Sequence, residues 1–163
     1  MLTAARRALD RVLDVHGGDP WHGSSTAHLL EGLTARQASA RPGPGIHSVW
    51  EIVLHMTAWT REVTSRLEGA EAKSPADGDW PAVGATTRTR WREATDALEA
   101  AQAALARAAE DAPNARWTTR VNQARDRPIG TGVTCLDTLE GLGLHHAYHG
   151  GQIGMLKRWL KAR

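Results

Sequence analysis

Two histidines near the end of the chain have the spacing of metal ligands. His145 and His149 lie four residues apart in the segment HHAYHGGQIGMLKRW. Residues four apart on an α-helix project from the same side, so both imidazoles can reach one ion through bonds of about 2 Å. A third imidazole from a neighbouring helix would complete the set and leave one coordination position open, as catalytic sites require. His55, far upstream in SVWEIVLHMTAW, is the candidate for that third ligand.

Each of these histidines also has a structural interpretation. His145 and His149 fall within the apolar stripe of a predicted helix, and a buried imidazole needs partners for both ring nitrogens. Hydrogen bonds to polar neighbours or a shared metal would each provide them. His146 could pair with His149 at a spacing of three, but it lies about 100° around the helix from His145, so we interpret it as a neighbour of the site. His55, taken alone, is typical of a structural residue that flanks an apolar seam.

Apolar periodicity and helix-start signals predict how these residues are positioned. Long helices are predicted over residues 2–17, over 48–67, from Thr86 or Thr87 to 110 and from 134 onward. Short ones are predicted to follow Ser24 or Ser25 and Thr34. The pairs Ser48–Glu51, Thr34–Gln37 and Thr134–Asp137 have the pattern of capping boxes. Residues 113–133 are predicted to form a long loop with one short strand at 116–121. The sequence therefore predicts an all-α fold, a four-helix bundle, in a single domain over residues 1–163.

Composition and charge exclude several classes of function. The net charge is +2, and no basic stripe with interleaved aromatic residues is present, so nucleic acid is not an expected partner. Four arginines between residues 116 and 127 are interpreted as a solvated loop. No apolar run approaches the roughly 18 residues of a membrane-spanning helix, and we expect no signal peptide. A single cysteine, Cys135, excludes an internal disulfide and fits a cytoplasmic location.

The two histidine segments together resemble the DinB/YfiT-like superfamily of proposed metalloenzymes. The stretches PWHG at 20–23 and LEGLTARQASARP at 30–42 resemble the upstream region of that family. The resemblance implies a four-helix bundle in which His55, His145 and His149 bind a divalent metal ion, with Gln152 supporting the site from one turn beyond His149. Zinc or nickel is the expected metal, with iron as a further candidate. Some members are S-transferases or isomerases that use a low-molecular-weight thiol such as mycothiol, bacillithiol or glutathione.

We therefore predict a metal-dependent enzyme that transfers a small thiol to a small-molecule substrate. A metal-dependent hydrolase with the same ligands and a non-enzymatic metal-binding or stress-response protein are the alternatives. This chain has no length for the additional domain of larger relatives, which weighs against an isomerase. A homodimer formed through an exposed apolar face is also expected.

Several other side chains were considered for a part in the chemistry. The candidate catalytic residues are Glu51, His22 and Gln152, with His47 as a further base, although Glu51 also caps a helix. Cys135 at a helix start is a further candidate nucleophile, although no His/Asp partner pattern accompanies it. Tyr148, which points about 100° away from His149, is predicted to pack in the core.

Overall fold

The structure is a computed structural model that describes residues 1–122 and 132–162. It is built from helices, with no β-strand in the described ranges, so the predicted all-α class is confirmed. Its elements are α1 (Thr3–Gly17), α2 (Thr26–Leu30), α3 (Ala35–Ser39), α4 (Val49–Glu68), α5 (Arg88–Asp111), the 3-10 helix η1 (Asn114–Thr118) and α6 (Cys135–Lys161). None of the described helices is both long enough and apolar enough to cross a membrane.

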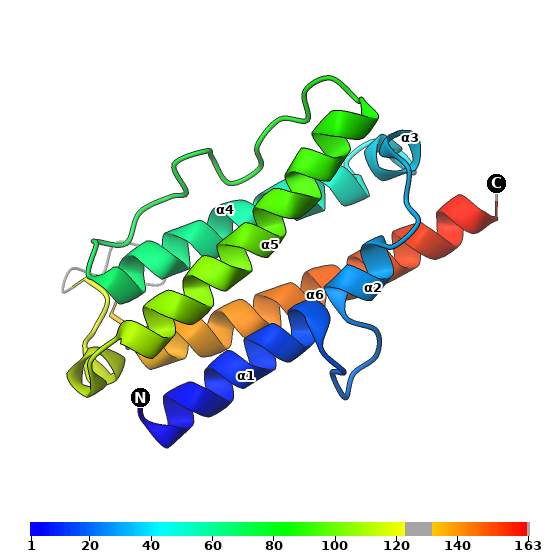
Figure 1. Ribbon diagram of the computed structural model, residues 1–163. Helices are drawn as coiled ribbons and strands as arrows, with labels where there is room; N and C mark the ends of the chain where they lie inside the picture. Colours follow the sequence, from blue (N-terminus) through cyan, green and yellow to red (C-terminus); the bar gives the residue numbers. More distant parts are fainter. Residues whose placement is uncertain (123–131, 163) are drawn as a thin grey trace.

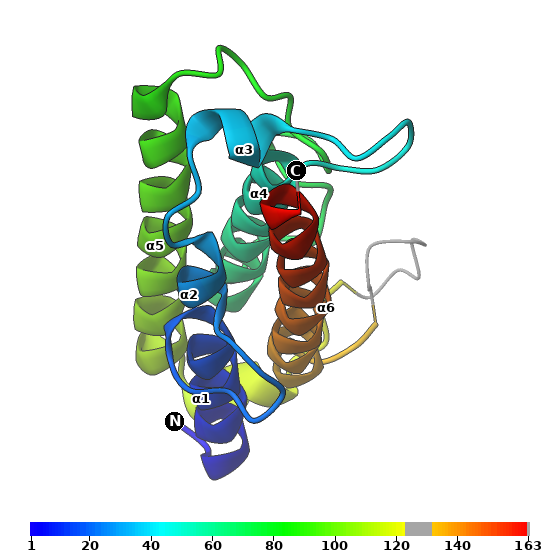
Figure 2. The same cartoon turned by 90° about the vertical axis from the view of Figure 1, so that its right-hand side faces the viewer.

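The four long helices lie alongside one another (Figure 1). Helix α4 packs between α5 and α6, and α1 packs mainly against α6 (Figure 2). α1 and α6 run in one direction, whereas α4 and α5 run in the other. Because α4 and α5 are parallel, residues 70–87, which connect them, must return along the length of α4, as Figure 1 shows. This return places a loop beside the helix that carries His55.

Local sequence signals fix where the helices that hold the histidines begin and end. Ser48 starts α4 and Thr134 starts α6, each through a capping box in which side chain and backbone exchange hydrogen bonds. Gly69 ends α4 with φ 108°, a left-handed conformation that favours glycine. These boundaries agree with the prediction because capping depends on residues only three or four apart.

The predicted strand at residues 116–121 is wrong. η1 occupies the first half of that segment, and the extended backbone after it makes only an isolated bridge between Arg120 and Thr134. The rest of the segment pairs with residues 132–135 through a few backbone hydrogen bonds, such as the one from the N–H of Val121 to the carbonyl of Val133, so no continuous strand forms. Residues 123–131 of the predicted loop lie outside the described part of the chain.

The core consists of two apolar clusters with a polar layer between them. The first cluster includes Leu9, Leu105 and Leu139, and the second includes Met56, Leu98 and Ile153. Burying one such aliphatic side chain contributes about 1.5–3 kcal/mol. Three polar side chains lie between the clusters along α4, α5 and α6, and all are buried: Thr60, Gln102 and His146.

Candidate metal centre

The side chains of His55 from α4 and of His145 and His149 from α6 converge. The Nε2 atom of His145 lies 2.9 Å from Nε2 of His55 and 3.1 Å from Nε2 of His149. Two nitrogens bound to one ion at about 2.0–2.1 Å, with angles near 90–110° between the bonds, would lie about 2.9–3.4 Å apart. One candidate ligand atom from each residue lies within 4.8 Å of the others. The spacing of the three rings therefore fits a single divalent ion.

The outer nitrogens of two rings determine which way the rings face. Nδ1 of His55 donates to the carbonyl oxygen of Asp79 at 2.6 Å, and Nδ1 of His149 donates to Oε1 of Gln152 at 2.7 Å. A carbonyl oxygen can only accept, so each neutral ring keeps its proton on Nδ1 and turns the lone pair of Nε2 inward. Metal-binding histidines have this arrangement in proteins. The Nδ1 atom of His145 is buried and has no hydrogen-bond partner.

Burial keeps these imidazoles neutral. Burial, then the neighbouring His149 and His55, lowers the pKa of His145 to about 4. Burial also lowers the pKa of His55 and that of His149 below the ordinary value of 6.5. Because neutral imidazole is the form that binds metal, the donor set is available at neutral pH without the release of protons.

His146, the next residue after His145, lies in the core instead. Its Nε2 donates to the hydroxyl oxygen of Thr60 at 3.1 Å, and its Nδ1 accepts from the side-chain amide of Gln102 at 3.2 Å. The hydroxyl of Thr60 in turn donates to the carbonyl of Met56. Burial lowers the pKa of His146 to about 3. Both ring nitrogens are thus occupied by protein groups, and this ring takes no part in the cluster.

The connection from α4 to α5 supplies residues that the sequence analysis missed. The indole of Trp80 stacks on His55 with ring centroids 3.9 Å apart and on His47 at 3.6 Å, and it meets His149 edge-on at 5.9 Å. The carboxylate of Asp79 accepts from the indole nitrogen of Trp59 at 2.7 Å. A turn ending at Gly78, with φ 87°, precedes them. The Gly-Asp-Trp-Pro run was the available signal, since it combines a turn with an aromatic residue in a polar loop.

Two of the proposed catalytic residues are ill-suited to act as a base at the cluster. Burial alone would raise the pKa of Glu51, but hydrogen bonds from Arg41 and Ser48 and the charge of Arg41 outweigh it and lower the pKa to about 2. His22 lines a different cavity, between α1 and α6, with Trp21 and Leu144. Their sequence positions could not show these surroundings, since both depend on contacts made elsewhere in the fold.

The structure also places the other side chains that the sequence singled out. Gln152 does contact the cluster through His149, whereas the ring of His47 stacks on Trp80, which in turn covers His55. Cys135 is buried, and burial raises the pKa of its thiol, contrary to the activated nucleophile that was considered. The assignment of Tyr148 to the core is wrong, because its side chain is exposed and packs edge-on against His149.

A cavity of about 440 Å³ opens beside the cluster. His55 and His145 form part of its wall, and its lining also includes Trp59, Val63, Arg66, Asp137 and Leu142. Arg66 forms a buried ion pair with Glu62 at 3.1 Å and lies over the ring of Trp59, which holds that wall in place. The cavity is therefore a mainly apolar space that ends at two of the three imidazoles.

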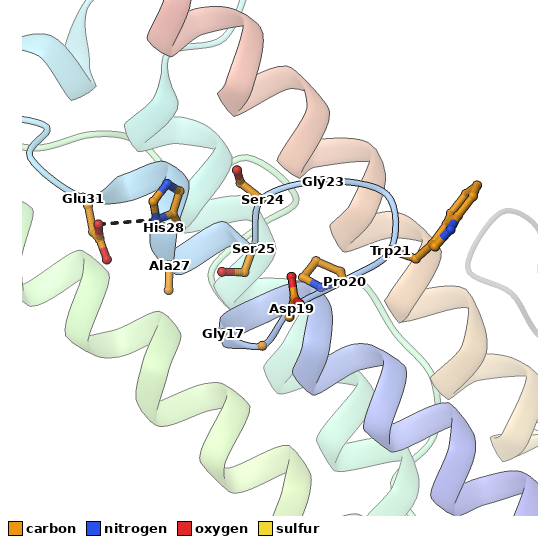
Figure 3. Close-up of a pocket in the computed structure, with 11 residues that line it drawn as sticks. Gly17, Asp19, Pro20, Trp21, Gly23, Ser24, Ser25, Ala27, His28 and Glu31 are labelled. Atoms are coloured by element: carbon orange, nitrogen blue, oxygen red, sulfur yellow. Dashed lines mark ion pairs between the residues drawn. The ribbon is translucent and has the colours of Figure 1, made fainter.

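A larger cavity, of about 950 Å³, lies between the end of α1 and α2 (Figure 3). Its walls are mostly backbone and small side chains, and the ion pair of His28 with Glu31 lies at its edge. Across residues 1–122 and 132–162, the group formed by His55, His145 and His149 is the one whose geometry could hold a metal ion. Size alone therefore does not identify the site.

A family model described as the DinB superfamily matches residues 21–153. The chain belongs to the DinB superfamily. The match includes α4 and the part of α6 that carries the histidines, so it covers every residue of the cluster. No match was found among curated proteins or among solved structures. Membership of the DinB superfamily confirms the resemblance noted from the sequence, and the histidine cluster is the feature of this member on which a function can be built.

Proposed function

We propose that this DinB superfamily protein is a metal-dependent enzyme in which His55, His145 and His149 bind one divalent ion. The observation that carries the proposal is the approach of three Nε2 atoms, two of them with lone pairs directed inward by Asp79 and Gln152. Without a cation, Nε2 of His145 could donate a proton to only one of these two lone pairs at a time, which would leave the other without a partner in a buried position. Imidazole donors suit zinc, nickel or iron, of which we expect zinc or nickel.

A divalent ion held by three neutral imidazoles supplies Lewis-acid chemistry, since it keeps its charge and lowers the pKa of a thiol or water that shares it. The protein's own residues position the donor rings and exclude water from them. Trp80 covers one face of His55, and the carbonyl of Asp79 fixes the tilt of that ring. The cavity beside His55 and His145 would receive a small substrate against the indole of Trp59.

The groups around the cavity that could accept a proton favour a thiol over water as the nucleophile. Hydrolysis requires a base that removes a proton from water. Two carboxylates line the cavity, those of Asp79 and Asp137. Hydrogen bonds from Thr134 lower the pKa of Asp137, which makes it a weak base, and the carboxylate of Asp79 already accepts a hydrogen bond from the indole nitrogen of Trp59. A thiol, with an ordinary pKa of about 8.5, ionises far more readily than water. We therefore propose that the enzyme transfers a low-molecular-weight thiol to an electrophilic small molecule.

The test begins with protein purified without a nickel column. Elemental analysis should find about one divalent ion per chain, and the loaded protein should consume thiol in the presence of a general electrophile. His149→Ala should lose both properties. His28→Ala, a change in an exposed histidine that lies at the other cavity, should keep both. Turnover of esters without thiol would support a hydrolase instead, and loaded protein that turns over neither class would contradict an enzymatic function.

A further inference from the structure

Helix α6 carries a second periodic pattern, on the side that faces solvent. The exposed positions follow one another in alternating steps of four and three residues, which is the seam of a coiled coil. These positions are Asp137, Gly141, Leu144, Tyr148, Gly151, Met155, Arg158 and Ala162. The histidines of the cluster lie on an adjacent face of the helix, so this pattern is independent of the metal site.

The middle of this seam is strongly apolar. Leu144 is 75% exposed, Tyr148 64% and Met155 67%. Trp21, which is fully exposed, lines a cavity of about 390 Å³ together with Leu144 (its indole points outward in Figure 3). These are the four most exposed large apolar side chains in the described part of the chain. Apolar side chains gathered in this way on a surface mark an interaction site.

The seam is complementary to itself when it is reversed. In an antiparallel pair centred between Tyr148 and Gly151, Leu144 meets the partner's Met155, and Tyr148 meets the partner's Gly151. A Cβ atom added at Gly151 would have nothing within 4 Å, so this position is an open notch that can receive a tyrosine ring. Each large side chain thus faces either a glycine or the flexible side chain of a methionine, which allows the two helices to pack closely.

The charges at the two ends of α6 favour the same antiparallel orientation. The first turns of α6 carry Asp137 and Glu140, and the last turns carry Arg158 and Lys161. A reversed copy places the acidic end of one seam beside the basic end of the other, with Glu140 next to the partner's Lys161. A parallel copy would place like charges together, which costs affinity. The occupant that fits this surface in shape and in charge is a second copy of the chain.

We propose that the protein forms a symmetric dimer in which α6 packs antiparallel against α6 of a second copy. Such an isologous interface uses the same residues twice and closes on itself. Trp21 and the cavity beside Leu144 extend the buried area beyond the two helices. The interface passes next to the metal centre, since Tyr148 contacts the ring of His149, but it does not depend on a bound ion.

The first test measures the mass of the full chain by sedimentation velocity at tens of micromolar. We expect a dimer, both with metal and after chelation. The double variant Leu144→Glu, Met155→Glu should dissociate, with at least a 100-fold rise in the dissociation constant, whereas Leu2→Glu, at an exposed apolar position that precedes α1, should not. Circular dichroism should match for all three proteins. A monomeric wild type, or a double variant that remains dimeric, would overturn the proposal.

The second test determines the register by disulfide cross-linking in a Cys135→Ser background. A mixture of Leu144→Cys chains and Met155→Cys chains should cross-link between unlike chains. Each variant alone should not, because the two copies of residue 144 would be about 16 Å apart along the paired helices, too far for a disulfide. Efficient cross-linking of Leu144→Cys with itself would indicate a parallel pair and would overturn the antiparallel arrangement.

Discussion

Two adjacent histidines on α6 have opposite surroundings. Both nitrogens of His146 are satisfied by Thr60 and Gln102, in a buried layer between two apolar clusters. His145 has two other imidazoles at one nitrogen and no partner at the other. The comparison shows that burial and residue type do not distinguish a structural histidine from a candidate ligand. What distinguishes them is whether the protein itself completes the hydrogen bonds of the ring.

The largest effect is expected when one ring is removed from the cluster, which tests whether these histidines bind the metal. His149→Ala should reduce bound metal from about one ion per chain to an undetectable level, because two imidazoles alone do not form a stable site. The fold should survive, since the apolar clusters do not include this residue. Elemental analysis together with far-UV circular dichroism would measure both outcomes. Full metal content in this variant would refute the ligand assignment.

The second prediction concerns His146, whose ring is held by protein groups and lies outside the cluster. His146→Leu should keep the metal but lower the free energy of unfolding by about 1–3 kcal/mol, because in the buried layer the amide of Gln102 would lose its acceptor on the ring and the hydroxyl of Thr60 would lose the donor on the ring. Urea denaturation followed by circular dichroism provides the measurement. If this variant folded normally and lost its metal, His146 would belong to the cluster after all.

A subtler comparison uses two glutamines that each hold a histidine. Gln152→Leu should weaken metal binding by about 10–100-fold, since it removes the group that fixes the ring of His149. Gln102→Leu should leave the affinity unchanged and affect only stability, because its partner is His146. Titration against a competing chelator separates the two. Equal losses of affinity would show that the two histidines are not independent.

The smallest effect concerns Glu51, at the start of α4. Its pKa is about 2 in the folded protein and has an ordinary value of 4.5. The charged form therefore stabilises the fold above pH 4.5, and this contribution disappears as the pH falls towards 2. At pH 7, Glu51→Gln should lower the free energy of unfolding by about 1 kcal/mol. The difference between the variant and the wild type should shrink below pH 4.5 in denaturation measured as a function of pH.

Local sequence signals were sufficient to predict the helices and two of the three histidines of the candidate site. Capping residues act over three or four positions, so Ser48 and Thr134 give the starts of α4 and α6 directly. The spacing of His145 and His149 likewise needs only the geometry of one helix. His55 is different, because its approach to the pair depends on how α4 packs against α6, so the residues alone made it a candidate and the family resemblance was needed to join it to the pair.

The parts that were missed depend on contacts between distant segments. Asp79 and Trp80 reach His55 because the parallel arrangement of α4 and α5 brings the connection back along α4. No periodic pattern in residues 70–87 encodes that path. Tyr148 was assigned to the core because its helical angle turns it away from His149. Whether that side of α6 is covered depends on neighbouring segments, and the structure leaves it exposed.

The stack of Trp80 on His55 gives the protein a spectroscopic label of its own. Of the seven tryptophans, this is the one whose indole lies face to face with a candidate ligand ring. A change in electron density on that imidazole will alter the emission of the indole, so intrinsic fluorescence can follow events at the cluster in unlabelled protein. A Trp80→Phe chain would supply the blank against which the signal from the other indoles is subtracted.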